Sequence, residues 1–183
     1  MSNKQHKNLS ARPALEPQNI AQLLTQELAL EAEATARYAE LAEVMHSHNN
    51  LDAAELFSRM AGIEQLHVEQ IRQQISQRRL TDLPATHYRW VGLEGPETTD
   101  YADLHYLMTP RQGLLLALLN EQRARDYYVN IADRSSDPEV LELARELAQE
   151  EREHVQWVEH WLKRYPPTEE GWDHDDDPPI LQD

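Results

Sequence analysis

Apolar residues recur every three to four positions through most of the chain, which is the spacing of one face of an α-helix. Strands would instead alternate apolar and polar residues. The spacing predicts helices over residues 20–48, 53–79, 110–134 and 138–165. Glycine occurs only five times and phenylalanine once, whereas Ala, Leu, Glu, Gln and Arg, which favour helices, are abundant. The chain is therefore expected to be all-α.

Capping residues support these boundaries. A side-chain oxygen at the start of a helix accepts hydrogen bonds from backbone N–H groups that have no helical partner. The expected caps are Asn19, Asp52, Thr109 and Asp137. A proline follows each of the last two, where its missing N–H costs nothing, and Pro166 and Pro167 end the fourth helix.

The connections between the helices predict the topology. Few residues separate the first helix from the second, or the third from the fourth, so each pair is expected to form an antiparallel hairpin. Residues 80–109 are long enough to run back along the bundle as a crossover, with a short helix over 101–108. The bundle domain is placed at 19–165, between a polar segment, 1–18, and an acidic, proline-rich tail, 166–183.

The two hairpins repeat one pattern. An offset of 90 residues lays 121–133 on 31–43, and an offset of 87 lays 141–155 on 54–68. The alignment pairs Glu31 with Glu121, Tyr38 with Tyr128, Glu64 with Glu151, and His67 with His154. Both Glu-x-x-His motifs therefore lie at the same position of a duplicated hairpin, which is much less common by chance than either motif alone.

The paired residues should meet inside the bundle. Each of the four glutamates lies 12 to 14 residues beyond its expected cap, about 18 to 21 Å along a helix of about 40 Å. They also share the apolar face of their helices. Four carboxylates buried together need compensating charge. Two divalent cations would supply it, and carboxylates with imidazoles suit iron, or alternatively manganese.

Several residues leave alternatives open. A polar seam neutralised by arginine is the competing interpretation, although Arg37, Arg59, Arg125 and Arg145 are expected off the core faces.

Glu27 is expected to reach solvent, with guidance of incoming metal as its alternative role. A third Glu-x-x-His motif, at Glu43, is assigned to solvent, and Glu151 is preferred over Glu150 as a ligand because of the repeat. The apolar run 114–119 is covered either by the crossover or by a second subunit.

Charge and composition exclude several functions. Acidic residues outnumber basic residues 33 to 17, giving a net charge of -16, so nucleic acid and anionic membranes are not expected partners. The absence of cysteine excludes disulfides, iron–sulfur clusters and thiolate-bound zinc. Neither a signal peptide nor a membrane span is evident, and a cytoplasmic location is expected.

The sequence resembles rubrerythrin-type ferritin-like di-iron domains over about residues 20–162. The matching segments are EAEATARY, IEQLH, TPRQGLLLALLNEQRARDYY and EEREHVQWVE. The resemblance implies a ferritin-like four-helix bundle with two iron ions. It implies the following roles: Glu31 and Glu121 each bind one ion, Glu64 and Glu151 bridge the two, His67 and His154 supply nitrogen, and Tyr38 and Tyr128 steady the carboxylates.

The resemblance also implies activity: oxidation of ferrous iron by oxygen or hydrogen peroxide, or reduction of peroxide, by a homo-oligomer. Three departures modify this expectation. Without cysteine the chain has no rubredoxin module, so electrons would come from a separate donor. Ala124 stands where peroxidase-type relatives place a further glutamate, and Gln65 stands where bacterioferritins bind haem. An iron-storage cage subunit and a non-redox interaction module with a vestigial site are the alternatives.

Overall fold

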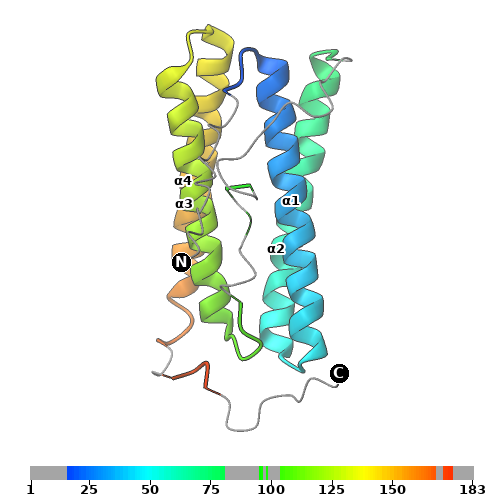
Figure 1. Cartoon of the computed structure of the whole chain (residues 1–183), viewed down its shortest axis with the longest axis vertical. Coiled ribbons are helices and arrows are strands. Elements are labelled where there is room, and N and C mark those ends of the chain that lie inside the picture. The colour runs from blue at the N-terminus through cyan, green and yellow to red at the C-terminus, as the bar shows by residue number, and fades with distance from the viewer. Residues whose placement is uncertain (1–15, 81–94, 97, 99–103, 168–170, 175–183) are drawn as a thin grey trace, which may run out of the picture.

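The structure, a computed structural model, describes residues 16–80, 95, 96, 98, 104–167 and 171–174. It contains four long helices running side by side (Figure 1). They are α1 (Ile20–Ser47), α2 (Leu51–Gln77), α3 (Pro110–Arg134) and α4 (Pro138–Leu162). Among the described residues there is no strand, so the all-α prediction is confirmed.

The helices form two antiparallel hairpins, α1 with α2 and α3 with α4. In Figure 1, α1 runs downward and α2 returns upward, while α3 runs upward and α4 returns downward. The hairpins contact each other through α2 with α3 and through α1 with α4. This arrangement confirms the predicted ferritin-like four-helix bundle. The predicted crossover lies largely outside the described residues.

Three of the four expected caps are present. Asn19 Oδ1 accepts from the Gln22 N–H at 3.0 Å, and Asp137 Oδ1 accepts from two N–H groups of the first turn of α4. At the start of α3, the Thr109 N–H donates to Gln112 Oε1 at 3.0 Å. These contacts satisfy N–H groups that would otherwise lack partners.

The predicted cap at Asp52 is wrong. Helix α2 begins two residues earlier, and Asn50 Oδ1 accepts from the Ala53 N–H at 3.4 Å. The side-chain amide of Asn50 also donates to the carbonyls of Tyr106 and Met108. Asn50 therefore ties the start of α2 to the segment that leads into α3, a long-range contact that local sequence does not reveal.

The helix predicted over 101–108 is absent from the part that the structure describes, where residues 104–108 form a turn. The Met108 N–H donates to the carbonyl of His105 at 2.9 Å, and the Leu107 N–H donates to His105 Nδ1 at 3.2 Å. Together with the Asn50 contacts, these hydrogen bonds use the backbone groups that a helix would need.

The fourth helix ends at Leu162, three residues before the predicted end. Arg111 Nη1 donates to the carbonyls of Leu162 and Tyr165, at 3.1 and 2.8 Å. The guanidinium thus stabilises the end of α4, where the last carbonyls of a helix have no partner within it.

Apolar packing falls into two clusters along the bundle. One includes Tyr38, Phe57 and Leu114, and the other includes Leu24, Tyr128 and Leu143. Between α2 and α3 the packing is close at Gly113, where an added Cβ would lie 3.0 Å from Phe57 Cζ. The two clusters are the apolar surroundings of a set of buried carboxylates described below.

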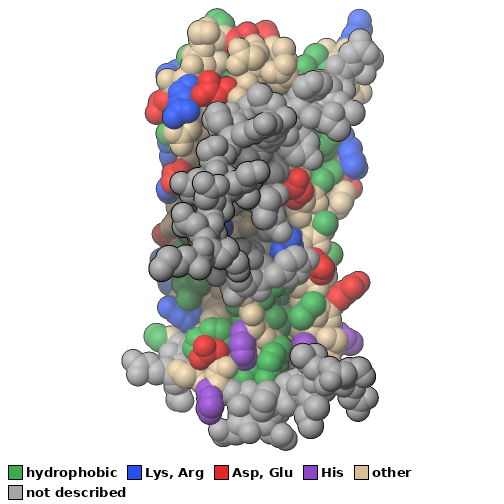
Figure 2. All heavy atoms as spheres, in the orientation of Figure 1, with side chains coloured by type: hydrophobic (Ala, Val, Ile, Leu, Met, Phe, Trp, Pro, Cys, Tyr) green, Lys and Arg blue, Asp and Glu red, His purple; other side chains and the backbone are tan. Residues whose placement is uncertain are grey.

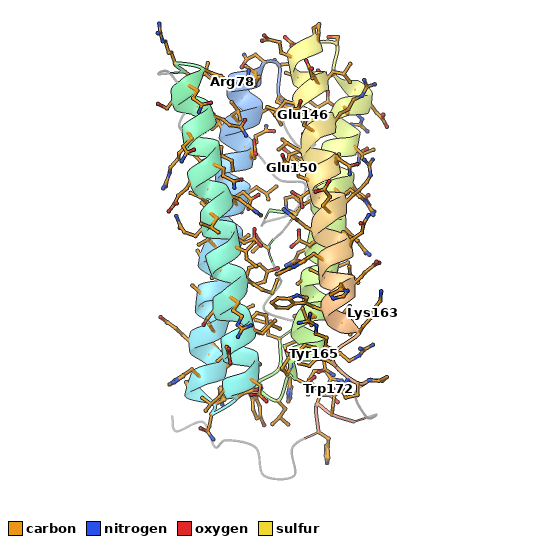
Figure 3. All side chains as sticks on the ribbon, turned by 180° about the vertical axis from the view of Figure 1, so that it is seen from behind. Arg78, Glu146, Glu150, Lys163, Tyr165 and Trp172 are labelled. Atoms are coloured by element: carbon orange, nitrogen blue, oxygen red, sulfur yellow. The ribbon has the colours of Figure 1, made fainter. Side chains whose placement is uncertain are left out.

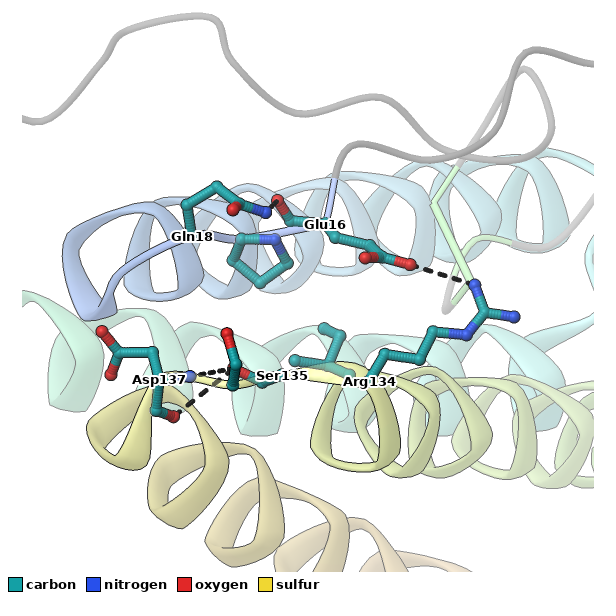
Figure 4. A pocket seen from close by; sticks show the side chains of 8 residues that line it. Glu16, Gln18, Arg134, Ser135 and Asp137 are labelled. Carbon is teal, nitrogen blue, oxygen red and sulfur yellow. Dashed lines mark hydrogen bonds and ion pairs between the residues drawn. The ribbon is translucent and has the colours of Figure 1, made fainter.

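The two ends of the bundle differ. At one end, Arg134 Nη1 lies 3.0 Å from Glu16 Oε1, beside a pocket of about 220 Å³ at the turn from α3 to α4 (Figure 4). Histidine side chains gather toward the other end of the face in Figure 2. His48 and His105 each stack on Tyr106, with ring centroids 4.9 and 4.7 Å apart.

In the described part of the chain, no helix has both the length and the apolar composition of a membrane span.

Candidate metal centre

Six of the predicted site residues come together as two groups of three. In each group, ligand atoms from two carboxylates and one imidazole lie within 4.8 Å of one another. The groups are Glu31, Glu64 and His67, and Glu121, Glu151 and His154. All four carboxylates are buried, with 3 to 6% of each residue exposed. Each of the four helices contributes at least one side chain.

The two groups have nearly the same geometry. His67 Nδ1 lies 3.1 Å from Glu64 Oε2 and 3.5 Å from Glu31 Oε2. In the other group, His154 Nδ1 lies 3.2 Å from Glu151 Oε2 and 3.4 Å from Glu121 Oε2. The internal repeat seen in the sequence is therefore also a repeat of atomic positions.

The two imidazoles join the groups. The rings of His67 and His154 stack with centroids 4.7 Å apart and planes 2° apart. In each Glu-x-x-His motif the carboxylate and imidazole are three residues apart, which places them on the same face of one helix. The groups are consequently two halves of one centre.

Burial raises the pKa of two of the carboxyl groups. Burial raises the pKa of Glu31 to about 8, against the lowering effect of its hydrogen bond with His67. The pKa of Glu121 is likewise raised to about 8, because burial outweighs its hydrogen bond with His154. In the absence of metal, burial therefore favours the protonated form of both carboxyl groups.

The imidazoles hold their protons still more strongly. Burial alone would lower the pKa of His67, but hydrogen bonds with Glu31 and Glu64 together raise it to about 10. The pKa of His154 is raised to about 11, because hydrogen bonds with Glu121 and Glu151 likewise outweigh burial. Protons therefore occupy the centre in the absence of another positive charge.

Glu27 departs from its expected position in solvent. Only 4% of the residue is exposed, and its Oε2 atom is buried without a hydrogen-bond partner. Burial raises the pKa of Glu27 well above its usual value, and the charges of Glu31, Glu150 and Glu151 raise it further. Because Glu27 lies one helical turn before Glu31, it shares that residue's inward face.

The other acidic alternatives lie outside the six-residue centre. Glu151 is buried in the centre, whereas Glu150 is exposed, although partial desolvation of its carboxyl group raises its pKa. Glu43 and His46 are both exposed, as predicted.

The four arginines that were expected away from the core faces differ in their burial. Arg59 and Arg145 are exposed, and Arg59 pairs with Glu55. Arg125 pairs with the exposed Asp126. Arg37, contrary to the prediction, is buried, and its Nε lies 3.6 Å from Glu40 Oε2. Its position before Tyr38 on α1 did not signal this.

The two tyrosines of the repeat, on α1 and α3, are also buried. Tyr38 and Tyr128 are each at most 2% exposed. Asn120 Nδ2 donates to the Tyr38 hydroxyl at 3.1 Å. Sequence reasoning missed Asn120, although its position directly before Glu121 in an apolar run was a signal. Hydrogen bonds from the tyrosines to the carboxylates remain a prediction.

The donor set fits two divalent cations. Oxygen and nitrogen donors without thiolate suit iron or manganese. The buried Glu31 Oε2 lies 3.5 Å from His67 Nδ1, a position from which it can bind a cation in place of the imidazole proton. Four carboxylates balance the charge of two such ions.

Comparisons with known proteins agree with this arrangement. Residues 113–177 match the rubrerythrin family. The chain is also similar to the crystal structure of an uncharacterized conserved protein from Magnetospirillum magnetotacticum MS-1, with 40% identity and a TM-score of 0.60. That similarity covers 82% of this chain and 98% of the other. No curated protein matches the chain.

Proposed function

This chain belongs to the rubrerythrin family, and we propose that its two groups of carboxylates and histidine bind a pair of iron ions. The bound pair would oxidise ferrous iron with oxygen or hydrogen peroxide, or reduce peroxide with electrons from a separate donor. The observation that carries the proposal is the matched geometry of four buried carboxylates and two stacked imidazoles.

Each half of the centre would hold one ion. Glu31 and Glu121 would each bind one ion, Glu64 and Glu151 would bridge the two, and the two histidines would supply nitrogen. In the metal-free protein each imidazole already lies between the two carboxylates of its own half. The side chains therefore need little rearrangement to exchange protons for cations.

The chemistry that a bound iron pair would supply is redox chemistry: one electron from each of two ferrous ions, with two protons, would convert one hydrogen peroxide molecule to two water molecules. The protein controls charge and solvent around this exchange. Apolar clusters pack on either side of the centre, and a pocket lined by several of the ligands connects the centre to solvent. The four carboxylates stabilise the higher charge of the ferric state.

The test is oxidation of the iron-loaded protein by oxygen and by peroxide, followed in a stopped-flow spectrometer. Glu64→Ala and Glu151→Ala should each reduce the oxidation rate by at least about a hundredfold, because each removes a bridging ligand. The matched control is Glu43→Ala, which removes the glutamate of an exposed Glu-x-x-His motif. Equal rates in all three variants would contradict the proposed site.

A further inference from the structure

One pocket leads from the surface to the centre. It encloses about 210 Å³ and lies among α1, α2 and α4. Figure 3 views the bundle from the side of α2 and α4 and labels Glu150. The residues that line the pocket outside the centre include Glu27, Gln70, Gln74, Glu150 and Glu153. The pocket also reaches Glu31, Glu151 and both histidines.

The polar residues that line this pocket are not repeated in the other hairpin. The offsets of 90 and 87 residues that superimpose the ligands also assign each pocket residue a counterpart in the other hairpin. Glu27 corresponds to Ala117, Glu150 to Ile63, Gln70 to Trp157, and Gln74 to Trp161. Carboxylates and amides on one side of the centre are thus matched by apolar and aromatic side chains on the other.

The position of Glu27 requires an explanation. Glu27 is only 4% exposed, and its Oε2 atom has no hydrogen-bond partner. An unpaired buried carboxylate is costly unless it is protonated or meets a cation. Neither packing nor helix formation requires glutamate here, since alanine occupies the equivalent position on α3.

We propose that Glu27 and Glu150 form a loading site that receives divalent cations and passes them to Glu31 and Glu151. This inference rests on the proposed function. Glu150 is exposed and would meet the incoming ion, while Glu27 is buried one turn from Glu31. Glu150 and Glu151 both line the pocket, so an ion bound by one carboxylate can pass to the other within it. The chain's net charge of -16 would favour the approach of cations.

The test is the rate at which metal-free protein takes up cobalt(II), followed by visible absorption in a stopped-flow spectrometer. Glu27→Gln and Glu150→Gln keep the side-chain shape while removing the charge. Each should slow uptake by about tenfold or more, with the final amount still close to two ions per chain. Glu43→Gln is the control, because it makes the same charge change at an exposed position of α1.

The outcomes separate this proposal from the proposed function. Uptake by both variants at the control rate would overturn the loading site while leaving the paired site intact. Loss of a cobalt ion at equilibrium in Glu27→Gln would make Glu27 a permanent ligand and would also overturn the loading role. If the unmodified protein bound no cobalt, both proposals would fail.

Discussion

Binding of metal to the metal-free protein at pH 7 should release at least about two protons for every two ions bound. The pKa values of Glu31 and Glu121 are about 8, that of His67 is about 10 and that of His154 is about 11. The raised pKa of each histidine depends on the carboxylates beside it, so each half of the centre holds at least one proton at pH 7, and that proton must leave when metal binds. Each half of the centre would exchange at least one proton for one divalent cation.

Isothermal titration calorimetry measures this release directly. Titrations with cobalt(II) in buffers of different ionisation enthalpy give the number of protons that the buffer takes up. At pH 9 the number should be lower than at pH 7, because Glu31 and Glu121 will hold fewer protons before metal arrives. Release near zero at pH 7, with two ions bound, would refute the inference that protons occupy the metal-free centre.

Three further predictions concern stability and reactivity. The metal-free protein should lose stability between about pH 5 and pH 9. Glu31 and Glu121 hold their protons more tightly in the folded state, so their contribution to stability disappears as pH rises through about 8. Urea unfolding should show no such fall for the metal-loaded protein. Gly62→Ala, whose new Cβ meets no atom within 4 Å, should raise the free energy of unfolding by up to about 1 kcal/mol. Gly113→Ala should be less stable than Gly62→Ala by about 1 to 3 kcal/mol, because its Cβ would crowd Phe57 and Leu56 and this cost opposes the same helix-propensity gain. Equal urea midpoints would contradict this. The unmodified protein should react with both oxygen and peroxide, and Ala124→Glu should shift the ratio of stopped-flow rates toward peroxide by supplying another carboxylate; a strong peroxide preference that Ala124→Glu leaves unchanged would contradict this role.

The six-residue centre could be located from the sequence because helical geometry is regular. Residues at the same distance from a helix start reach the same height, and residues three or four apart share a face. The repeat then distinguished Glu64 and Glu151 from the exposed Glu43. Placement of these side chains needed no knowledge of how the hairpins pack in detail.

Features that depend on contacts between distant segments were missed. The burial of Glu27 arises where α1 meets α2 and α4, so its position near the start of a helix was misleading. Asn50 begins α2 because it also binds carbonyls more than 50 residues away. Arg111 similarly binds the carbonyls of Leu162, at the end of α4, and of Tyr165. Local propensity cannot report such contacts.

The metal content of the protein tests the central claim most directly. The purified chain would be reconstituted with ferrous iron under anaerobic conditions, freed of loosely bound metal and measured by elemental analysis. Two Glu₂His groups predict close to two iron ions per chain, and Glu64→Ala or Glu151→Ala should lower the value below one. Absence of bound iron in the unmodified protein, or equal loss of iron from Glu43→Ala, would contradict the assignment of the paired site.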